Sequence, residues 1–111
     1  MRISIFGLGY VGAVSAGVLA NEGHEVIGVD PVQTKVDIIN RGQSPIIEAE
    51  IGDIIAASVR AKRLRATTSV AEAVRDTDLS FVCVGTPSQT NGNLDFRYIR
   101  RVCEEIGQSL K

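Results

Sequence analysis

The feature that most constrains the fold is a set of three glycines, spaced Gly-x-Gly-x-x-Gly, directly after a short apolar segment. Residues 3–6 (ISIF) precede Gly7, Gly9 and Gly12, and a helix-like stretch follows. Gly7 permits a tight turn, Gly9 lets a bulky ligand approach the backbone, and Gly12 lets a helix lie close to the strand. The amides at such a helix N-terminus favour an anion, and the segment from Gly7 to Gly17 contains no basic side chain. The pattern predicts a strand, a phosphate-binding turn and a helix.

A second strand and an acidic residue complete this pattern. Residues 25–29 (EVIGV) predict the strand, and Asp30 follows Gly12 by 18 positions (30 minus 12), close to the roughly 20 expected before a ribose-binding acid. A carboxylate accepts hydrogen bonds from ribose hydroxyls but repels a 2′-phosphate, by about 4 kcal/mol at about 4 Å and an effective dielectric near 20. We therefore predict a site for NAD rather than NADP. Asp30 also suits an N-cap with Pro31 at the first helical position, and the two roles are compatible.

These residues allow two other interpretations. A methyltransferase also places an acid after its second strand to hold a ribose, but here Gly12 lies three residues after Gly9, where a pyrophosphate-binding turn requires it. A glycine-rich turn that only packs tightly is the purely structural interpretation. The order of strand, turn, helix, strand and acid favours the dinucleotide site over both.

The rest of the chain alternates strands and helices, which predicts a parallel sheet covered on both faces. The further elements expected are helices near 32–41 and around 51–59, a strand near 64–67, a helix that begins at a Ser69–Glu72 capping box, a strand over 79–84 and a helix after Asp95. The unbroken apolar run at 79–84 predicts a strand buried on both faces, next to the first strand where the strand order reverses. The expected fold is an α/β, Rossmann-type doubly wound parallel sheet over residues 1–111, truncated after the fourth strand and its helix.

Composition excludes several classes of protein. Twelve Lys and Arg residues against thirteen Asp and Glu give a net charge of −1, without a long run of either sign, so nucleic acid and polybasic membrane binding have no support. No apolar run reaches membrane length and no signal-peptide pattern is present, so we expect a cytoplasmic protein. Cys83 and Cys103 lack metal-ligand spacing and are expected to be buried packing residues, and His24 is expected to be structural. No metal site is expected.

A threonine marks the end of the fourth predicted strand. The sequence Gly85-Thr86-Pro87 stands there, beside the glycine turn in the expected sheet. The Thr86 hydroxyl can donate to a cofactor phosphate or ribose at this edge. The same residues also suit a turn in which threonine caps the following backbone, and spacing alone does not choose between the two.

Together these motifs resemble the amino-terminal segment of the nucleotide-sugar 6-dehydrogenases, the UDP-glucose/GDP-mannose dehydrogenase family. The resemblance covers essentially the whole chain and rests on residues 6–12 (FGLGYVG), 23–30 (GHEVIGVD), Lys35, 44–46 (SPI) and 84–87 (VGTP). The loop residues 85–88 (GTPS) and 91–95 (NGNLD) look most like the GDP-mannose branch, which acts in alginate synthesis.

The resemblance implies a set of NAD contacts. Tyr10 and Val11 would bind NAD through backbone amides, Asp30 and Lys35 would lie at the adenosine ribose, and Thr86 would lie near the rest of the cofactor. By itself Lys35 would be interpreted as a solvated lysine on a helix surface. Family members oxidise a sugar CH₂OH twice with two NAD, through a thiohemiacetal and a thioester on a cysteine that follows much later in the chain. No catalytic residue is therefore expected here.

The expected partners are a nucleotide-sugar substrate, bound through central and sugar-nucleotide domains absent here, and further copies of the protein in a homo-oligomer. One departure concerns a turn: the family commonly has Glu-Pro-Gly-Leu where this chain has Glu48-Ala49-Glu50-Ile51. Three alternatives stay open, namely a UDP-glucose 6-dehydrogenase, a β-hydroxyacid dehydrogenase and a non-catalytic NAD-sensing module.

Overall fold

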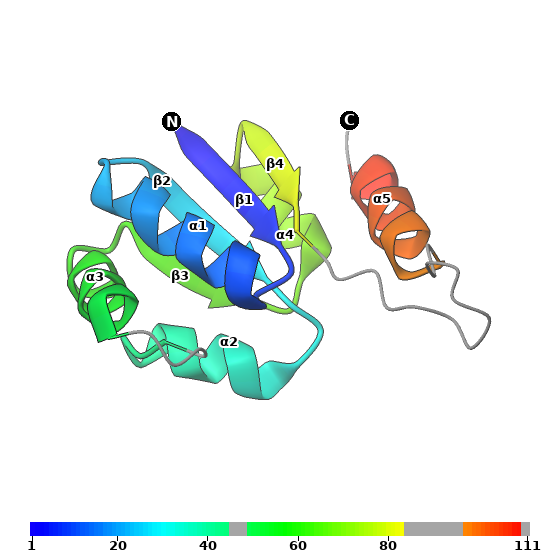
Figure 1. Cartoon of the computed structure of the whole chain (residues 1–111). Helices are drawn as coiled ribbons and strands as arrows, with labels where there is room; N and C mark the ends of the chain where they lie inside the picture. Colours follow the sequence, from blue (N-terminus) through cyan, green and yellow to red (C-terminus); the bar gives the residue numbers. More distant parts are fainter. Residues whose placement is uncertain (45–48, 84–96, 110–111) are drawn as a thin grey trace.

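The computed structural model describes residues 1–44, 49–83 and 97–109, which form a parallel sheet between two layers of helices (Figure 1). The elements, in chain order, are β1 (Arg2–Phe6), α1 (Tyr10–Asn21), β2 (Glu25–Val29), α2 (Gln33–Asn40), α3 (Ala49–Arg60), β3 (Leu64–Thr67), α4 (Val70–Asp76), β4 (Leu79–Val82) and α5 (Arg97–Ser109). Each predicted strand and helix is present within these ranges; the strands at 25–29 and 64–67 have the predicted bounds, and the bounds of the others differ by one to a few residues.

The strand order is β3-β2-β1-β4, and each pairing is parallel. β1 therefore lies between β2, which follows it through α1, and β4, which arrives by the longer crossover. This is the predicted reversal of strand order beside the first strand. Phe6 is paired with Val29 on one side and with Val82 on the other, so three strands end at one edge. Ligands of open α/β sheets bind at this carboxyl edge.

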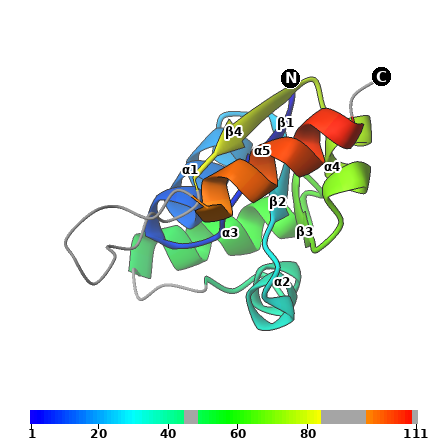
Figure 2. The same cartoon turned by 90° about the vertical axis from the view of Figure 1, so that its right-hand side faces the viewer.

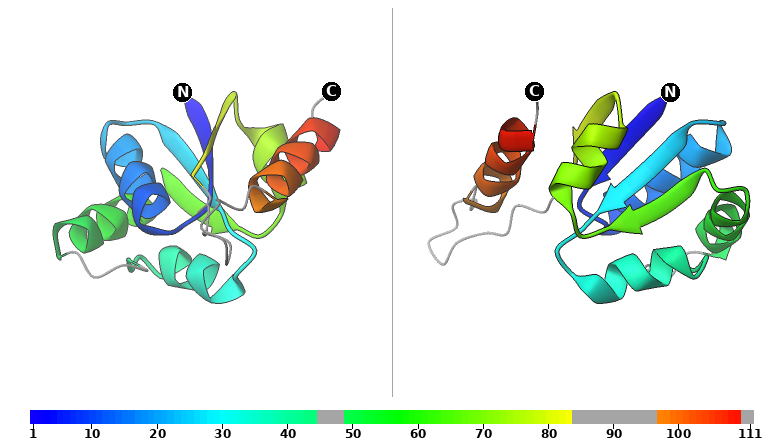
Figure 3. Two further views of the ribbon diagram at one scale, coloured as in Figure 1. Left: turned by 45° about the vertical axis from the view of Figure 1, so that its right-hand side comes forward. Right: turned by 180° about the vertical axis from the view of Figure 1, so that it is seen from behind.

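Helices cover both faces of the sheet, and each face has its own apolar cluster. Ile3 and Ile5 of β1 point to the face that carries α1 and α3, whereas Phe6 points to the face that carries α4 and α5. Figures 2 and 3 show the two helix layers on opposite sides of the strands. Because side chains alternate along a strand, a strand covered on both faces can be apolar at successive positions, as Ile5 and Phe6 are.

The prediction that the fourth strand is buried on both faces is wrong. Three of the four residues of β4 are exposed, including Phe81 and Val82 at 45% and 40%. β4 is the last strand of the described sheet, so no neighbour covers its outer edge. Beside it, α1 and β4 border an apolar surface groove of about 320 Å³, lined by Val14, Ser15, Val18, Leu19, Phe81 and Cys83. An apolar run indicates that its residues are suited to burial, but within the described part of the chain the side chains of β4 remain largely exposed.

The prediction that Cys103 is buried is also wrong, whereas Cys83 is half-buried against the cluster beneath α1. α5 packs on α4 mainly through Val102, which is 8% exposed, and through the partly buried Ile106. Cys103 follows Val102 and is turned about 100° around the helix from it, away from the contact. The expected cap Asp95 lies outside the described residues.

α4 begins at its predicted cap, with only half of the expected capping box. The Ser69 hydroxyl accepts a hydrogen bond from the Glu72 N–H at 3.2 Å. The Glu72 carboxylate instead accepts from Arg65 at 2.7 Å and from Thr67 Oγ1 at 2.9 Å, and these bonds lower its pKa. Glu72 therefore ties the start of α4 to the preceding strand β3, a contact that the capping-box pattern does not indicate.

Hydroxyl groups fix the pairing of β4 with β1. Ser4, fully buried in β1, shares a 2.7 Å hydrogen bond with Ser80 of β4 and a 3.0 Å hydrogen bond with the Thr77 hydroxyl. Thr77 is placed by a further bond from its hydroxyl to the Ala73 carbonyl at 2.7 Å. A polar residue inside an otherwise apolar strand thus sets the register of the outermost strand.

Candidate functional site

The glycine turn lies at the carboxyl edge of the sheet, between β1 and α1. Gly7 has a φ of 100°, a backbone conformation that residues with a Cβ rarely adopt. Its N–H still donates to the Val29 carbonyl at 2.7 Å, which continues the ladder between β1 and β2 by one bond. The chain turns away from the sheet immediately afterwards and enters α1.

The glycines of this region are required for different reasons. A Cβ at Gly12 would lie 1.6 Å from the carbonyl oxygen of Gly7, so α1 can begin against the turn only if position 12 is glycine. A Cβ at Gly28 would lie 2.7 Å from a methyl group of Leu8, which packs there at 1% exposure. A Cβ at Gly9, by contrast, would meet no atom of the described residues within 4 Å. Space is therefore open above Gly9 and closed at the other two positions.

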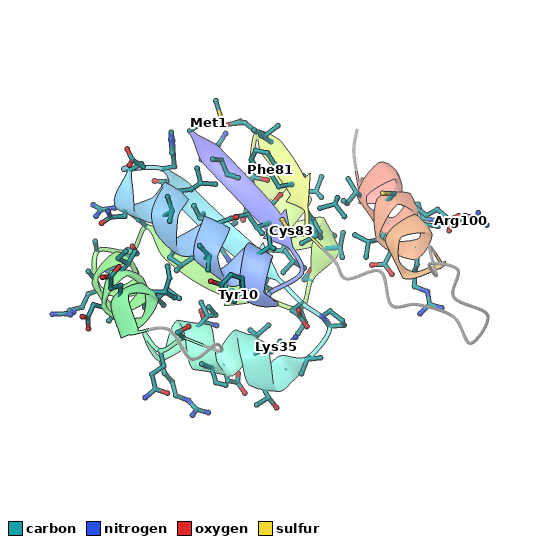
Figure 4. The ribbon with its side chains drawn as sticks, in the orientation of Figure 1. Met1, Tyr10, Lys35, Phe81, Cys83 and Arg100 are labelled. Atoms are coloured by element: carbon teal, nitrogen blue, oxygen red, sulfur yellow. The ribbon has the colours of Figure 1, made fainter. Side chains whose placement is uncertain are left out.

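The amino end of α1 faces this open space. Gly9 is the N-cap, no side chain caps the helix, and no acidic residue lies in its first turn. Tyr10 and Val11 are 65% and 62% exposed, and Figure 4 shows Tyr10 at this end of the helix. The first amides of a helix have no partner within it, and the helix dipole places partial positive charge there. The turn can therefore bind an anionic group through backbone N–H groups.

Asp30 stands at the end of β2 and is 5% exposed. Its Oδ2 accepts a hydrogen bond from the Leu8 N–H at 2.8 Å, and its Oδ1 accepts one from the Val32 N–H at 2.9 Å. The expected N-cap role is not observed, because α2 begins at Gln33 with Val32 as its N-cap. Asp30 instead closes a short turn onto the residue two positions later, as aspartates often do.

Lys35 lies on the first turns of α2 with its Nζ 4.0 Å from Asp30 Oδ2. Its side chain is 41% exposed, so the charge faces both the carboxylate and solvent. Figure 4 shows Lys35 on α2, at the edge of the sheet where α1 begins. The structure thus brings together Asp30 and Lys35, which the family resemblance had paired and residue spacing alone had not.

A cavity of about 160 Å³ opens on the other side of the same strand ends. Its walls are partly apolar, and its rim carries two charged residues from α5; the lining residues are Phe6, Gly7, Val29, Pro31, Thr68, Val70, Arg101, Val102 and Glu105. The cavity adjoins Asp30 through Val29 and Pro31. A flat apolar group with a polar edge would fit such a site, and nothing in the sequence pattern had indicated it.

The remaining predicted residues are placed as follows. Thr86 lies outside the described residues. His24, at the opposite end of the sheet, has its Nδ1 3.3 Å from the amino group of Met1, as a structural residue would. Burial raises the pKa of the Cys83 thiol, which disfavours the thiolate form.

Within residues 1–44, 49–83 and 97–109, no cluster of His, Cys, Asp and Glu side chains could hold a metal ion. Nor does any helix in these ranges have the length and apolarity needed to cross a membrane.

The strand order, the glycine turn and the acid at the end of β2 define a Rossmann-type dinucleotide-binding domain. The model of the UDP-glucose/GDP-mannose dehydrogenase family, NAD binding domain, matches residues 1–111, and the chain belongs to this family. The predicted family, fold class and cofactor, NAD, are thereby confirmed.

The chain is 57% identical over 111 residues to the GDP-mannose 6-dehydrogenase of Azotobacter vinelandii, covering all of this chain and 26% of that protein. It is 37% identical to the UDP-glucose 6-dehydrogenase of Rhizobium meliloti, again covering all of this chain and 26% of the relative.

A ternary complex of GDP-mannose dehydrogenase from Pseudomonas aeruginosa has the same fold, with a TM-score of 0.97 and 57% identity over 98% of this chain and 25% of that one. A UDP-glucose dehydrogenase from the archaeon Pyrobaculum islandicum is also similar in structure, with a TM-score of 0.92 and 34% sequence identity. The match covers 97% of this chain and 25% of the archaeal one. The chain spans about a quarter of the length of these relatives.

Proposed function

We propose that this chain is the NAD-binding portion of a nucleotide-sugar 6-dehydrogenase that oxidises GDP-mannose to GDP-mannuronate in two NAD-dependent steps. The observation that carries the choice of sugar is the difference between 57% identity to a GDP-mannose enzyme and 37% to a UDP-glucose enzyme. A UDP-glucose 6-dehydrogenase is the second candidate, because relatives of that kind also match the whole chain.

In this proposal the pyrophosphate of NAD lies over Gly9 and is bound by the amides of Tyr10 and Val11. The open space at Gly9, together with the uncapped start of α1, supports this placement. Gly7 and Gly12 contribute by shaping the turn, since each is held in a conformation or contact that a side chain would disturb. NAD supplies the hydride acceptor, and the described residues supply binding and orientation.

The adenosine ribose would lie between Asp30 and Lys35. An ionised carboxylate offers about four acceptor sites, of which two are used by the Leu8 and Val32 amides, so two remain for ribose hydroxyls. Lys35 can donate to the same hydroxyls from the exposed side. The adenine would then enter the neighbouring cavity lined in part by Val29, Pro31 and Arg101. Thr86 is proposed to lie near the rest of the cofactor, as the family resemblance implies.

The proposal assigns no catalytic residue to this chain. Sugar oxidation in this family needs a thiol, and neither cysteine occupies the family's catalytic position. The sugar-nucleotide substrate would bind through the parts of the protein beyond this segment. The proposal also includes a homo-oligomeric state and a cytoplasmic location, which the sequence led us to expect. It includes no nucleic acid or membrane partner. The exposed apolar groove between α1 and β4 supports an assembly in which this surface is covered.

The activity is tested with the product of the complete reading frame, by following NADH absorbance. We expect GDP-mannose to yield two NADH per sugar and UDP-glucose to be turned over at least tenfold more slowly. The 111-residue chain alone serves as the control and is expected to oxidise neither. Preferred turnover of UDP-glucose would indicate a UDP-glucose 6-dehydrogenase instead. Turnover by the isolated chain would contradict the assignment of catalysis to other domains.

Cofactor preference gives a second test, which needs no substrate. We expect NADH to bind at least tenfold more tightly than NADPH, because a 2′-phosphate would lie against the buried Asp30 carboxylate, a repulsion of about 4 kcal/mol before screening. Asp30→Ala should reduce this difference. Titration of cofactor fluorescence measures both affinities, and equal binding of the two dinucleotides by the unmutated protein would contradict the role of Asp30 at the ribose.

A further inference from the structure

We propose that Asp30 is also a positioning residue, which holds the glycine turn in the conformation that binds pyrophosphate. This inference rests on the proposed NAD site and extends it. It makes the carboxylate responsible for two parts of the cofactor: the ribose, by direct contact, and the pyrophosphate, through the backbone of Leu8.

The glycine turn leaves the sheet between Gly7 and Leu8. The Gly7 N–H makes the last bond of the ladder, to the Val29 carbonyl at 2.7 Å. The next amide, that of Leu8, has no strand partner left, yet the residue is 1% exposed and is out of reach of water. A buried N–H without an acceptor is destabilising. Asp30 Oδ2, at 2.8 Å, supplies that acceptor.

Packing contacts also hold the turn in place. The Leu8 side chain packs against Gly28 of β2, and the Gly7 carbonyl lies against Gly12 of α1. The Gly7 carbonyl and the Leu8 N–H belong to one planar peptide, so this peptide is held at its oxygen by the contact with Gly12 and at its N–H by the bond to Asp30. The following residue, Gly9, accepts from the Ala13 N–H at 2.9 Å and begins the helix. The orientation of the Leu8 amide therefore decides how the amides from Gly9 onward face the open space.

The Asp30 carboxylate is itself held by a hydrogen bond to each of its oxygens. Oδ1 is bound by the Val32 N–H at 2.9 Å and Oδ2 by the Leu8 N–H, so the group cannot rotate without breaking one of them. Its charge is nearly buried, with Lys35 Nζ 4.0 Å away. Removing the carboxylate would release the end of β2, the start of α2 and the glycine turn together. The ribose and pyrophosphate subsites are thus coupled through one side chain.

The test uses NADH and its 2′,3′-dideoxyadenosine analogue, whose adenosine ribose has no hydroxyl for Asp30 to contact. Both are titrated against the unmutated protein, Asp30→Ala and Asp30→Asn, with Asp37→Ala as the control. Asp37 is a half-buried carboxylate on α2 that accepts from Gln33 and does not touch the turn. We expect Asp30→Ala to weaken binding of the analogue about tenfold or more and Asp37→Ala to leave it unchanged. Unchanged affinity of Asp30→Ala for the analogue would overturn the proposal.

Amide hydrogen exchange of the ligand-free protein provides a reading that does not depend on the cofactor. Asp30→Ala should reduce protection of the Leu8 amide at least tenfold, while the Gly7 amide, bound to Val29, changes much less. Asp30→Asn, which keeps one acceptor oxygen, should restore part of the protection at Leu8 and part of the analogue affinity while losing the discrimination against NADPH. Equal loss of protection at Gly7 and Leu8 in both variants would indicate general destabilisation and contradict a positioning role.

The two titrations also separate this inference from the proposed ribose contact. If the unmutated protein bound NADH and the analogue equally, and Asp30→Ala still weakened both, the ribose contact would be wrong and the positioning role would be supported. If Asp30→Ala weakened NADH alone, the ribose contact would stand and the positioning role would be wrong.

Discussion

Replacement of Gly12 by alanine is expected to lower the free energy of unfolding by about 3 kcal/mol or more, a large part of the roughly 5–15 kcal/mol that stabilises an ordinary domain. The new Cβ would lie 1.6 Å from the Gly7 carbonyl oxygen and 2.8 Å from its carbon. Both are backbone atoms, so no side-chain rotation relieves the overlap. Either α1 moves away from the turn or the turn itself changes shape.

Urea denaturation followed by circular dichroism measures this effect, with Gly52→Ala as the control. Gly52 is an interior residue of α3, and a Cβ there would meet nothing within 4 Å. That variant should be as stable as the unmutated protein or more stable by about 0.5–1 kcal/mol, because alanine is the better helix former. A Gly12→Ala protein of unchanged stability would show that α1 does not lie against the turn as described.

Replacement of Gly9 by valine is expected to abolish detectable NAD binding, at least a hundredfold loss of affinity, while the fold is retained. The backbone at Gly9 has a φ of −79°, which any residue can adopt, and among the described residues no atom lies within 4 Å of a Cβ placed there. The valine side chain is therefore not expected to destabilise the fold. In the proposed site that space belongs to the pyrophosphate, and the branched side chain would occupy it.

Circular dichroism and calorimetry on one sample separate folding from binding for Gly9→Val. The result to expect is a normal spectrum and thermal transition with no heat of NADH binding. Near-normal affinity would show that the open space over Gly9 is not the pyrophosphate site, and that the glycine serves only the turn. Gly9 and Gly12 thus form a pair in which one glycine is required by the ligand and the other by the fold.

The sequence was sufficient where a property depends on neighbours along the chain. The glycine spacing specified the turn, the apolar runs specified the strands, and Ser69 specified the start of α4, because a turn, a strand and an N-cap are each formed within a few residues. Asp30 could be recognised as a candidate ribose contact since it stands at a set distance from the turn. Lys35 could not, and only the family resemblance assigned it a role, because a lysine on a helix is usually solvated.

Other features were determined only when the strands were packed together. The hydrogen bond between Asp30 and Leu8 joins residues 22 positions apart, and it exists because β1 and β2 end level with each other. The fit of Leu8 onto Gly28 depends on the same pairing. Phe81 and Cys103 show the reverse case, in which an apolar residue stays exposed because no element of the described structure packs over it. Periodicity tells which residues are suited to burial, but register and packing decide which atoms meet, because those distances depend on elements remote in the chain.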